Sequence, residues 1–118
     1  MNQNLVWDNL LGTDFDDPTF PWQDFRTGVD ILPIYGDPTQ GCSSALLRYQ
    51  PGAVIPEHLH VGAEFLLILR GSQADARGIY TLGSLLINPA ETSHGIFSEQ
   101  GCIVLAIWEK PVKFINTK

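Results

Sequence analysis

The sequence predicts a single all-β domain whose strands form a closed or two-layered sheet. The chain has 118 residues, of which 44% are hydrophobic and 17% are charged, values typical of one domain with its own core. From residue 28 onward, glycines recur at intervals of 5 to 12 residues with short apolar runs between them. Such spacing is typical of many short strands joined by turns in a sandwich or barrel. No segment after residue 28 carries a helical period over about ten residues.

Residues 1–27 are expected to form an acidic arm that precedes the barrel. Gly12, Pro18 and Pro21 interrupt any regular element there, which favours an extended segment over a helix. Aromatic side chains in the arm would anchor it on the domain: Phe15, Phe20, Trp22 and Phe25. Residues 1–37 contain seven aspartates and only one basic residue, Arg26, so the whole net charge of −6 falls in this part. An acidic run of this kind is usually solvated surface rather than a docking site.

The barrel is expected to span residues 28–118, with nine strands in chain order. The apolar runs Leu66–Leu69 and Leu85–Ile87 are too continuous for a half-exposed strand, which favours strands of a closed sheet. The predicted strands are 29–35, 43–50, 54–58, 64–70, 72–75, 83–87, 95–98, 103–109 and 112–115.

Composition excludes several classes of partner. Seven basic against thirteen acidic residues argue against binding a nucleic acid backbone. The N-terminus lacks the basic start and apolar stretch of a secretory signal. The longest apolar run, Cys102–Trp108, is far shorter than the roughly 20 residues that cross a bilayer as a helix. We therefore expect a cytoplasmic protein without membrane contact, in which Cys42 and Cys102 are reduced thiols.

All three histidines belong to one pattern. His58 and His60 are two residues apart, so both imidazoles would project from the same face of a strand. Glu64 follows four residues later, and His94 comes from a later strand. A buried histidine is more often a core residue with satisfied hydrogen bonds than a ligand. Three histidines and one carboxylate together would suit one divalent ion of iron, manganese, nickel or zinc.

The spacing of these residues resembles that of the cupin superfamily. Gly52, His58, His60, Glu64 and Gly71 stand in the order and spacing of the first cupin motif. The second motif is recognisable in Gly83, Pro89 and His94, although Glu91 and Ser98 replace its usual glycine and asparagine. The resemblance implies an RmlC-like jelly-roll β-barrel with the metal ligands His58, His60, Glu64 and His94.

Within the cupins, residues 21–109 resemble the ChrR-like group, which includes the cupin domain of ChrR anti-sigma factors and small dioxygenases that cleave acetylacetone. The supporting segments are 47–52, 75–80, 88–89 and 101–102. The resemblance implies either a metal-dependent, dioxygenase-like enzyme acting on a small organic carbonyl or aromatic compound, or a non-catalytic metal-bound sensor. Because the chain begins about 20 residues before the cupin region, we expect no separate helical zinc domain and no anti-sigma role.

Residues next to the ligands are candidates for a substrate pocket. By strand parity, Leu66 and Ile68 share a face with Glu64, and Ile96 shares one with His94. Phe97 and Trp108 are further candidates, although each of these apolar residues is more often part of a core. Glu57 and Glu91 would orient ligands or move protons, unless they are ordinary surface glutamates. We also expect a homodimer, because an aromatic arm can cross to a neighbour and cover an edge strand.

Overall fold

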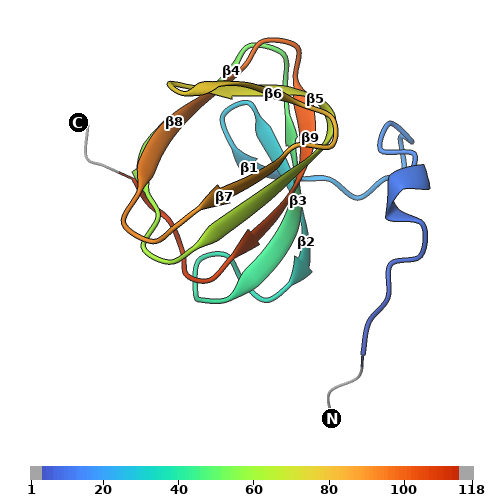
Figure 1. Ribbon diagram of the computed structural model, residues 1–118. Helices are drawn as coiled ribbons and strands as arrows, with labels where there is room; N and C mark the ends of the chain where they lie inside the picture. The colour runs from blue at the N-terminus through green and yellow to red at the C-terminus, as the bar shows by residue number, and fades with distance from the viewer. Residues whose placement is uncertain (1–3, 115–118) are drawn as a thin grey trace.

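The computed structural model describes residues 4–114, which form ten antiparallel strands (Figure 1). The strands follow one another along one curled sheet in the order β1-β2-β3-β9-β5-β8-β4-β10, while β6 and β7 pair with β5. Their bounds are β1 (Gln23–Arg26), β2 (Val29–Tyr35), β3 (Ser43–Tyr49), β4 (Ala53–Leu59), β5 (Glu64–Asp75), β6 (Gly78–Thr81), β7 (Leu85–Asn88), β8 (Ser93–Ser98), β9 (Cys102–Trp108) and β10 (Lys113–Phe114). The predicted all-β fold is therefore confirmed.

Strand β5 joins the two walls of the curled sheet. The sequence predicts two strands here, 64–70 and 72–75, because Gly71 stands between them. In the structure the chain runs through this glycine, which has a φ of 79°, and a bulge lies between Ile68 and Arg70 in the pairing with β9. The first part of β5 pairs with β7 and β9, and its last part pairs with β6 and β8. The bend lets one strand serve both walls.

Two short strands were not expected from the sequence. Strand β1 lies in the segment assigned to the arm and pairs with β2 from Gln23 to Arg26; its four residues carry no apolar run that would mark a strand. Strand β6 forms a hairpin with the end of β5. The strand expected at 112–115 is the shorter β10, which pairs with β4. Ile115 and the expected ends of arm and barrel at residues 1–3 and 115–118 lie outside the described residues.

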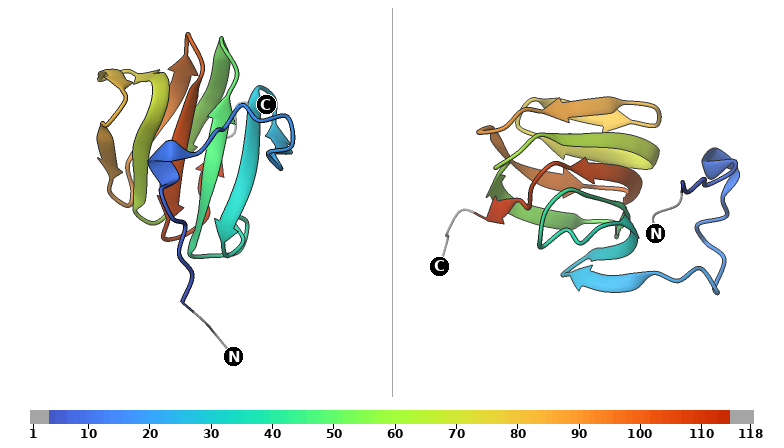
Figure 2. Two further views of the ribbon diagram at one scale, coloured as in Figure 1. Left: turned by 90° about the vertical axis from the view of Figure 1, so that its right-hand side faces the viewer. Right: turned by 90° about the horizontal axis from the view of Figure 1, so that it is seen from below.

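The sheet has an inner and an outer apolar face. The inner face carries the main core, in which Ala45, Ile68 and Val104 are fully buried. On the outer face, Phe15, Phe20 and Trp22 of the arm pack over a second cluster of β-strand residues: Leu46, Leu69 and Ile103. Figure 2 shows the arm, in blue, running along the outside of the sheet. The expected aromatic anchoring of the arm is seen for these three side chains within the same chain.

Helical structure in residues 4–114 is limited to the 3-10 turn η1 (Leu10–Gly12) in the arm. The prolines and the glycine of the arm explain why it does not extend into a longer helix. Within this part of the chain there is no helix with the length and apolar character needed to span a membrane.

The two cysteines are both free, as expected. Cys42 is exposed in the loop before β3, and Cys102 is buried at the start of β9. Burial raises the pKa of the Cys102 thiol to about 11, so this side chain stays protonated and acts as a small apolar core residue.

Candidate metal centre

The three histidines and Glu64 meet on the inner face of the sheet. His58 lies near the end of β4 and pairs in register with His94 of β8, while Glu64 begins β5. One potential ligand atom from each of the four side chains lies within 4.8 Å of the others. All four residues are buried, with exposed fractions between 1% and 6%. The structure thus brings together, in one buried cluster, the four residues selected from the sequence.

Each histidine is held at its Nδ1 atom, so the hydrogen bonds define its tautomer. His58 Nδ1 donates to the Pro56 carbonyl at 3.0 Å, and His94 Nδ1 donates to Asp75 Oδ2 at 3.2 Å, because these oxygens can only accept. His60 Nδ1 lies 3.0 Å from Thr92 Oγ1, whose own proton goes to the Pro89 carbonyl. All three Nδ1 atoms therefore carry a proton, so in each neutral ring the Nε2 atom keeps a lone pair.

Two of the Nε2 atoms, those of His60 and His94, are fully buried without a hydrogen-bond partner within the described residues. His60 Nε2 lies 2.9 Å from Glu64 Oε1, and His94 Nε2 lies 3.7 Å from the same oxygen. Lone pairs of nitrogen and oxygen at this distance repel unless a cation lies between them. The donor set therefore fits a metal ion, which accepts lone pairs from imidazole and carboxylate together.

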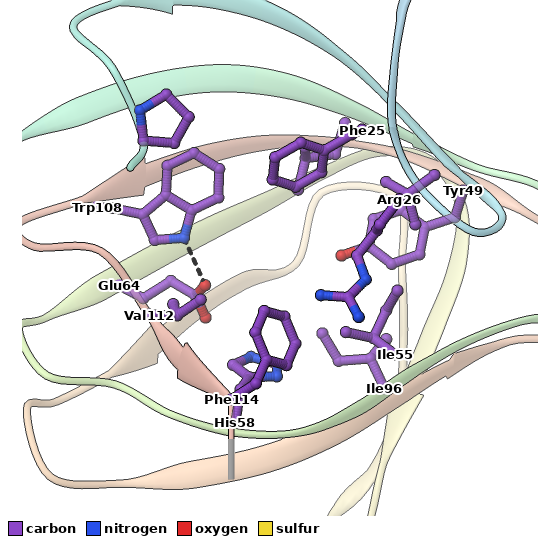
Figure 3. Close-up of a pocket in the computed structure, with 13 residues that line it drawn as sticks. Phe25, Arg26, Tyr49, Ile55, His58, Glu64, Ile96, Trp108, Val112 and Phe114 are labelled. Atoms are coloured by element: carbon purple, nitrogen blue, oxygen red, sulfur yellow. Dashed lines mark hydrogen bonds between the residues drawn. The ribbon is translucent and has the colours of Figure 1, made fainter. Parts of the chain in front are cut away.

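Hydrogen bonds keep Glu64 in its ionised form. Trp108 Nε1 donates to Oε2 at 2.8 Å (Figure 3), and Asn88 Nδ2 donates to Oε1 at 3.0 Å. Burial alone would raise the pKa of Glu64, but the hydrogen bonds that the carboxylate accepts, among them the one from the Trp108 indole, outweigh burial and lower the pKa. Glu64 is thus a charged and oriented carboxylate in a buried site.

A second carboxylate, Asp75, supports the cluster from behind His94. Asp75 accepts hydrogen bonds from the Arg77 backbone and guanidinium and from the Tyr80 hydroxyl. Burial alone would raise its pKa, but these bonds and the one from His94 lower it to about 2. Arg77 also donates to Asn88 Oδ1 at 3.2 Å. Because Asn88 binds Glu64, one network connects His94 and Glu64.

Sequence reasoning did not select the residues that hold the ligands in place. Asp75, Asn88 and Thr92 make these hydrogen bonds, whereas Glu57 and Glu91, the expected candidates, are both exposed. Glu57 precedes His58 on β4 and so faces the opposite side of the strand. Glu91 lies in the turn before β8 with a φ of 70°. Asp75 and Asn88 lie within the segments that resemble the ChrR-like group, which was the available signal.

Burial favours the neutral form of two of the imidazoles. It lowers the pKa of His58 and of His94 below the usual 6.5, and it outweighs the hydrogen bonds that these rings donate to Pro56 and Asp75. Neutral imidazole is the form that binds metal. These two rings can therefore bind a cation at neutral pH without losing a proton first.

A small pocket opens beside the cluster, with a volume of about 70 Å³. His58 and Glu64 reach into it, and Figure 3 shows the apolar and aromatic side chains around them. Ile96 and Trp108, two of the expected pocket residues, line it. The remaining lining residues are Phe25, Arg26, Val29, Pro38, Leu47, Tyr49, Ile55, Val112 and Phe114.

The other three expected pocket residues lie elsewhere. Leu66 and Ile68 are packed into the main core, with exposed fractions of 1% and 0%. Phe97 is 44% exposed, because it follows Ile96 on β8 and so points to the outer face. Strand parity identified the inward side chains on β5, but it does not separate those that line a pocket from those that fill the core.

The curled half-barrel and its buried three-histidine, one-carboxylate cluster define a cupin of the RmlC-like type. The chain belongs to the ChrR cupin-like family, whose defining sequence pattern matches residues 14–110. The anti-sigma-E factor ChrR of Cereibacter sphaeroides is 35% identical over 80 residues, which make up 65% of this chain and 38% of ChrR. The chain thus spans well under half the length of this relative.

Solved structures share the fold at lower identity. An acetylacetone dioxygenase from Acinetobacter johnsonii superposes with a TM-score of 0.74 and 13% identity, over 99% of this chain and 84% of that one. An RmlC-like cupin protein from Ralstonia eutropha gives a TM-score of 0.73 and 23% identity, over 82% and 68%. At these identities the likeness concerns the fold.

Proposed function

We propose that the protein holds one divalent transition metal ion, of iron, zinc, manganese or nickel, through His58, His60, Glu64 and His94. The observation that carries this proposal is the convergence of the four donor atoms within 4.8 Å, with every Nδ1 atom already committed to another partner. A metal in such a site supplies Lewis-acid or redox chemistry.

We further propose a dioxygenase-like reaction on a small organic carbonyl or aromatic compound. The apolar walls of the pocket, such as Leu47, Ile55 and Ile96, would bind the apolar part of the substrate and exclude water. Trp108 and Asn88 would hold Glu64 in one orientation while the substrate enters. The shared fold with an acetylacetone dioxygenase supports this reading without assigning the substrate.

A second candidate function is a metal-bound sensor or ligand-binding module. The 35% identity to part of an anti-sigma factor favours it. In that case the same pocket would bind a small molecule without converting it, and the network around Asp75 would serve metal retention alone.

Metal content tests the first proposal. Purified protein should contain close to one equivalent of a transition metal by elemental analysis, and His60→Ala should lose most of it. Glu57→Gln is the matched control, because Glu57 is exposed beside the ligands and should leave the metal content unchanged. A folded wild-type protein that takes up no transition metal would contradict the proposal.

Turnover separates the enzyme from the sensor. Iron-loaded protein should consume oxygen with a β-diketone or a hydroxylated aromatic ketone, measured with an oxygen electrode. Zinc as the native metal, with no turnover of any compound in such a series, would favour the sensor.

A further inference from the structure

Arg26 places a positive charge in the pocket. It ends β1, lines the pocket, and stacks its guanidinium 3.9 Å from the centroid of the Phe114 ring (Figure 3). The other three arginines each pair with an aspartate: Arg48 with Asp30, Arg70 with Asp16, and Arg77 with Asp75. Among residues 4–114, no carboxylate lies within salt-bridge distance of Arg26. A half-buried charge of this kind is stabilised by an anion.

Tyr49 offers a second donor in the same pocket. Its side chain, on β3, is only 5% exposed and lines the pocket beside Arg26 (Figure 3). Burial raises the pKa of Tyr49 far above its usual value, so the hydroxyl keeps its proton and can donate. Among the described residues that line the pocket, one pair of side chains is joined by a hydrogen bond, Trp108 and Glu64.

The remainder of the pocket has a different chemistry. Val29, Leu47, Ile55, Ile96 and Val112 form apolar walls. At one end of the pocket lie His58 and Glu64, which are two of the four candidate metal ligands. The volume of about 70 Å³ limits the ligand to a small molecule. A fitting ligand therefore has an anionic group, a short apolar segment and an oxygen atom that faces His58 and Glu64.

We propose that the pocket binds a small oxo-carboxylate. Its carboxylate is held by Arg26 and Tyr49, and its carbonyl oxygen is directed toward the four metal-ligating side chains. The position of the carbonyl relies on the metal-binding function proposed above. The binding of the carboxylate by Arg26 and Tyr49 does not depend on the metal, because it follows from the positions of these two donors in the pocket. Guanidinium suits this role because it donates two parallel hydrogen bonds to a carboxylate.

Calorimetric titration of zinc-loaded, full-length protein tests the inference. The probes are 2-oxobutanoate, 3-oxobutanoate and 4-oxopentanoate, each compared with its uncharged methyl ester. At least one acid should bind, and its methyl ester should bind at least about tenfold more weakly. Arg26→Met should weaken binding of that acid about tenfold to a hundredfold, which is the usual cost of losing a hydrogen bond to a charged group. Arg26→Lys should restore part of the affinity.

Two further variants separate the pocket from general effects. Tyr49→Phe should weaken the acid by about fivefold to tenfold, as expected for one lost hydrogen bond. Arg70→Met removes the same charge outside the pocket, where Arg70 pairs with Asp16, and should leave the affinity unchanged. Equal affinity of acid and ester for the wild type, or equal affinity of wild type and Arg26→Met for the acid, would overturn the inference.

Zinc content measured on the same samples keeps the two proposals apart. If the Arg26→Met variant retains zinc and binds the acid as tightly as the wild type does, the role of Arg26 is overturned and the metal site is not affected. A wild type that retains neither zinc nor iron, manganese or nickel would overturn the metal site. The comparison of acid with ester on that same protein would still decide whether Arg26 binds a carboxylate.

Discussion

At the scale of single residues, the cluster depends on which ring nitrogen of each histidine carries the proton. Each Nδ1–H group donates one hydrogen bond. The acceptor is a backbone carbonyl for His58, a hydroxyl for His60 and a carboxylate for His94. Of these three partners, only Asp75 carries a charge, and its own hydrogen bonds with Arg77 and Tyr80 hold it in place. Hydrogen bonds behind a ligand fix the ring orientation and raise the basicity of the coordinating nitrogen.

Replacing Asp75 should therefore weaken metal binding while the fold remains. Asp75→Asn keeps the size of the side chain but removes the charge that faces His94, and zinc affinity should fall about tenfold or more. The measurement is competition with a chromophoric chelator. Asp30→Asn is the matched control, because Asp30 pairs with Arg48 away from the cluster. Unchanged zinc affinity in Asp75→Asn would contradict a positioning role for this carboxylate.

The lowered pKa values of His58 and His94 predict how stability depends on pH. In the unfolded chain these imidazoles take up protons near the usual pKa of 6.5, whereas burial delays protonation in the folded chain. The unfolded state then binds more protons, so the free energy of unfolding decreases as the pH falls below about 6.5. Glu64 and Asp75 add their own loss only at lower pH, because their ordinary pKa values are 4.5 and 3.8.

Thermal unfolding of the metal-free protein checks this dependence. The melting temperature should stay level from about pH 8 to pH 7 and decrease from about pH 6.5 to pH 5. His58→Asn should show a shallower decrease, since it removes one of the two groups. Equal melting temperatures at about pH 7 and pH 5 would contradict neutral, buried imidazoles.

At the scale of secondary-structure elements, the bend in β5 decides where Glu64 and Asp75 lie. Both carboxylates belong to this strand, one at each end, and they reach the same cluster from two walls of the sheet. The bend lies at Gly71, where φ is 79° and an added Cβ would clash with the Gly101 carbonyl oxygen. Only glycine fits both the backbone conformation and the close approach of β9.

Gly71→Ala should therefore destabilise the protein more than an equivalent change at an uncrowded turn. Gly83 provides that comparison, since its φ is 88° and nothing lies within 4 Å of an added Cβ. Gly83→Ala should cost only the left-handed conformation, about 1–2 kcal/mol. Gly71→Ala adds a backbone clash and should cost clearly more in urea unfolding. Equal costs at the two positions would show that the approach of β9 does not constrain β5.

At the scale of the whole molecule, the arm covers only part of the outer sheet face. Beside the covered area, four apolar side chains on β5, β7 and β9 are between 37% and 59% exposed: Phe65, Leu85, Ile87 and Ile107. Phe65 pairs in register with both Ile87 and Ile107, so these side chains form one continuous patch. An apolar patch of this kind on a sheet face is typical of a contact between proteins.

We propose that this patch pairs with the same patch of a second copy, which gives a homodimer. One surface can serve both partners in a two-fold symmetric contact. Light scattering should then report about twice the chain mass of 13.1 kDa. The double change Ile87→Lys and Ile107→Lys should give monomers. Ile79→Lys is the control, because Ile79 is 73% exposed on β6, outside the patch. A monomeric wild type at micromolar concentration would contradict the proposal.

Much of the candidate centre was predictable, because its ligands lie in short segments with regular spacing. His58 lies on β4 and His60 directly follows its end, so their separation of two residues puts both side chains on the same side of the chain, and Glu64 begins the next strand. The pocket was less predictable. Leu66 and Ile68 point inward as parity predicts, but neighbouring strands cover them completely. Burial of that kind depends on strands distant in sequence, which local periodicity does not describe.

The sequence by itself determined the all-β class, the positions of most strands along the chain and the four residues of the cluster, because alternation and turn spacing are local properties. Only the tertiary structure decided what surrounds the cluster. Asp75 meets His94 across the pairing of β5 with β8, and Arg26 meets Phe114 from opposite ends of the chain. Such contacts arise from the curl of the sheet, which brings residues of β1 and β10 to one pocket.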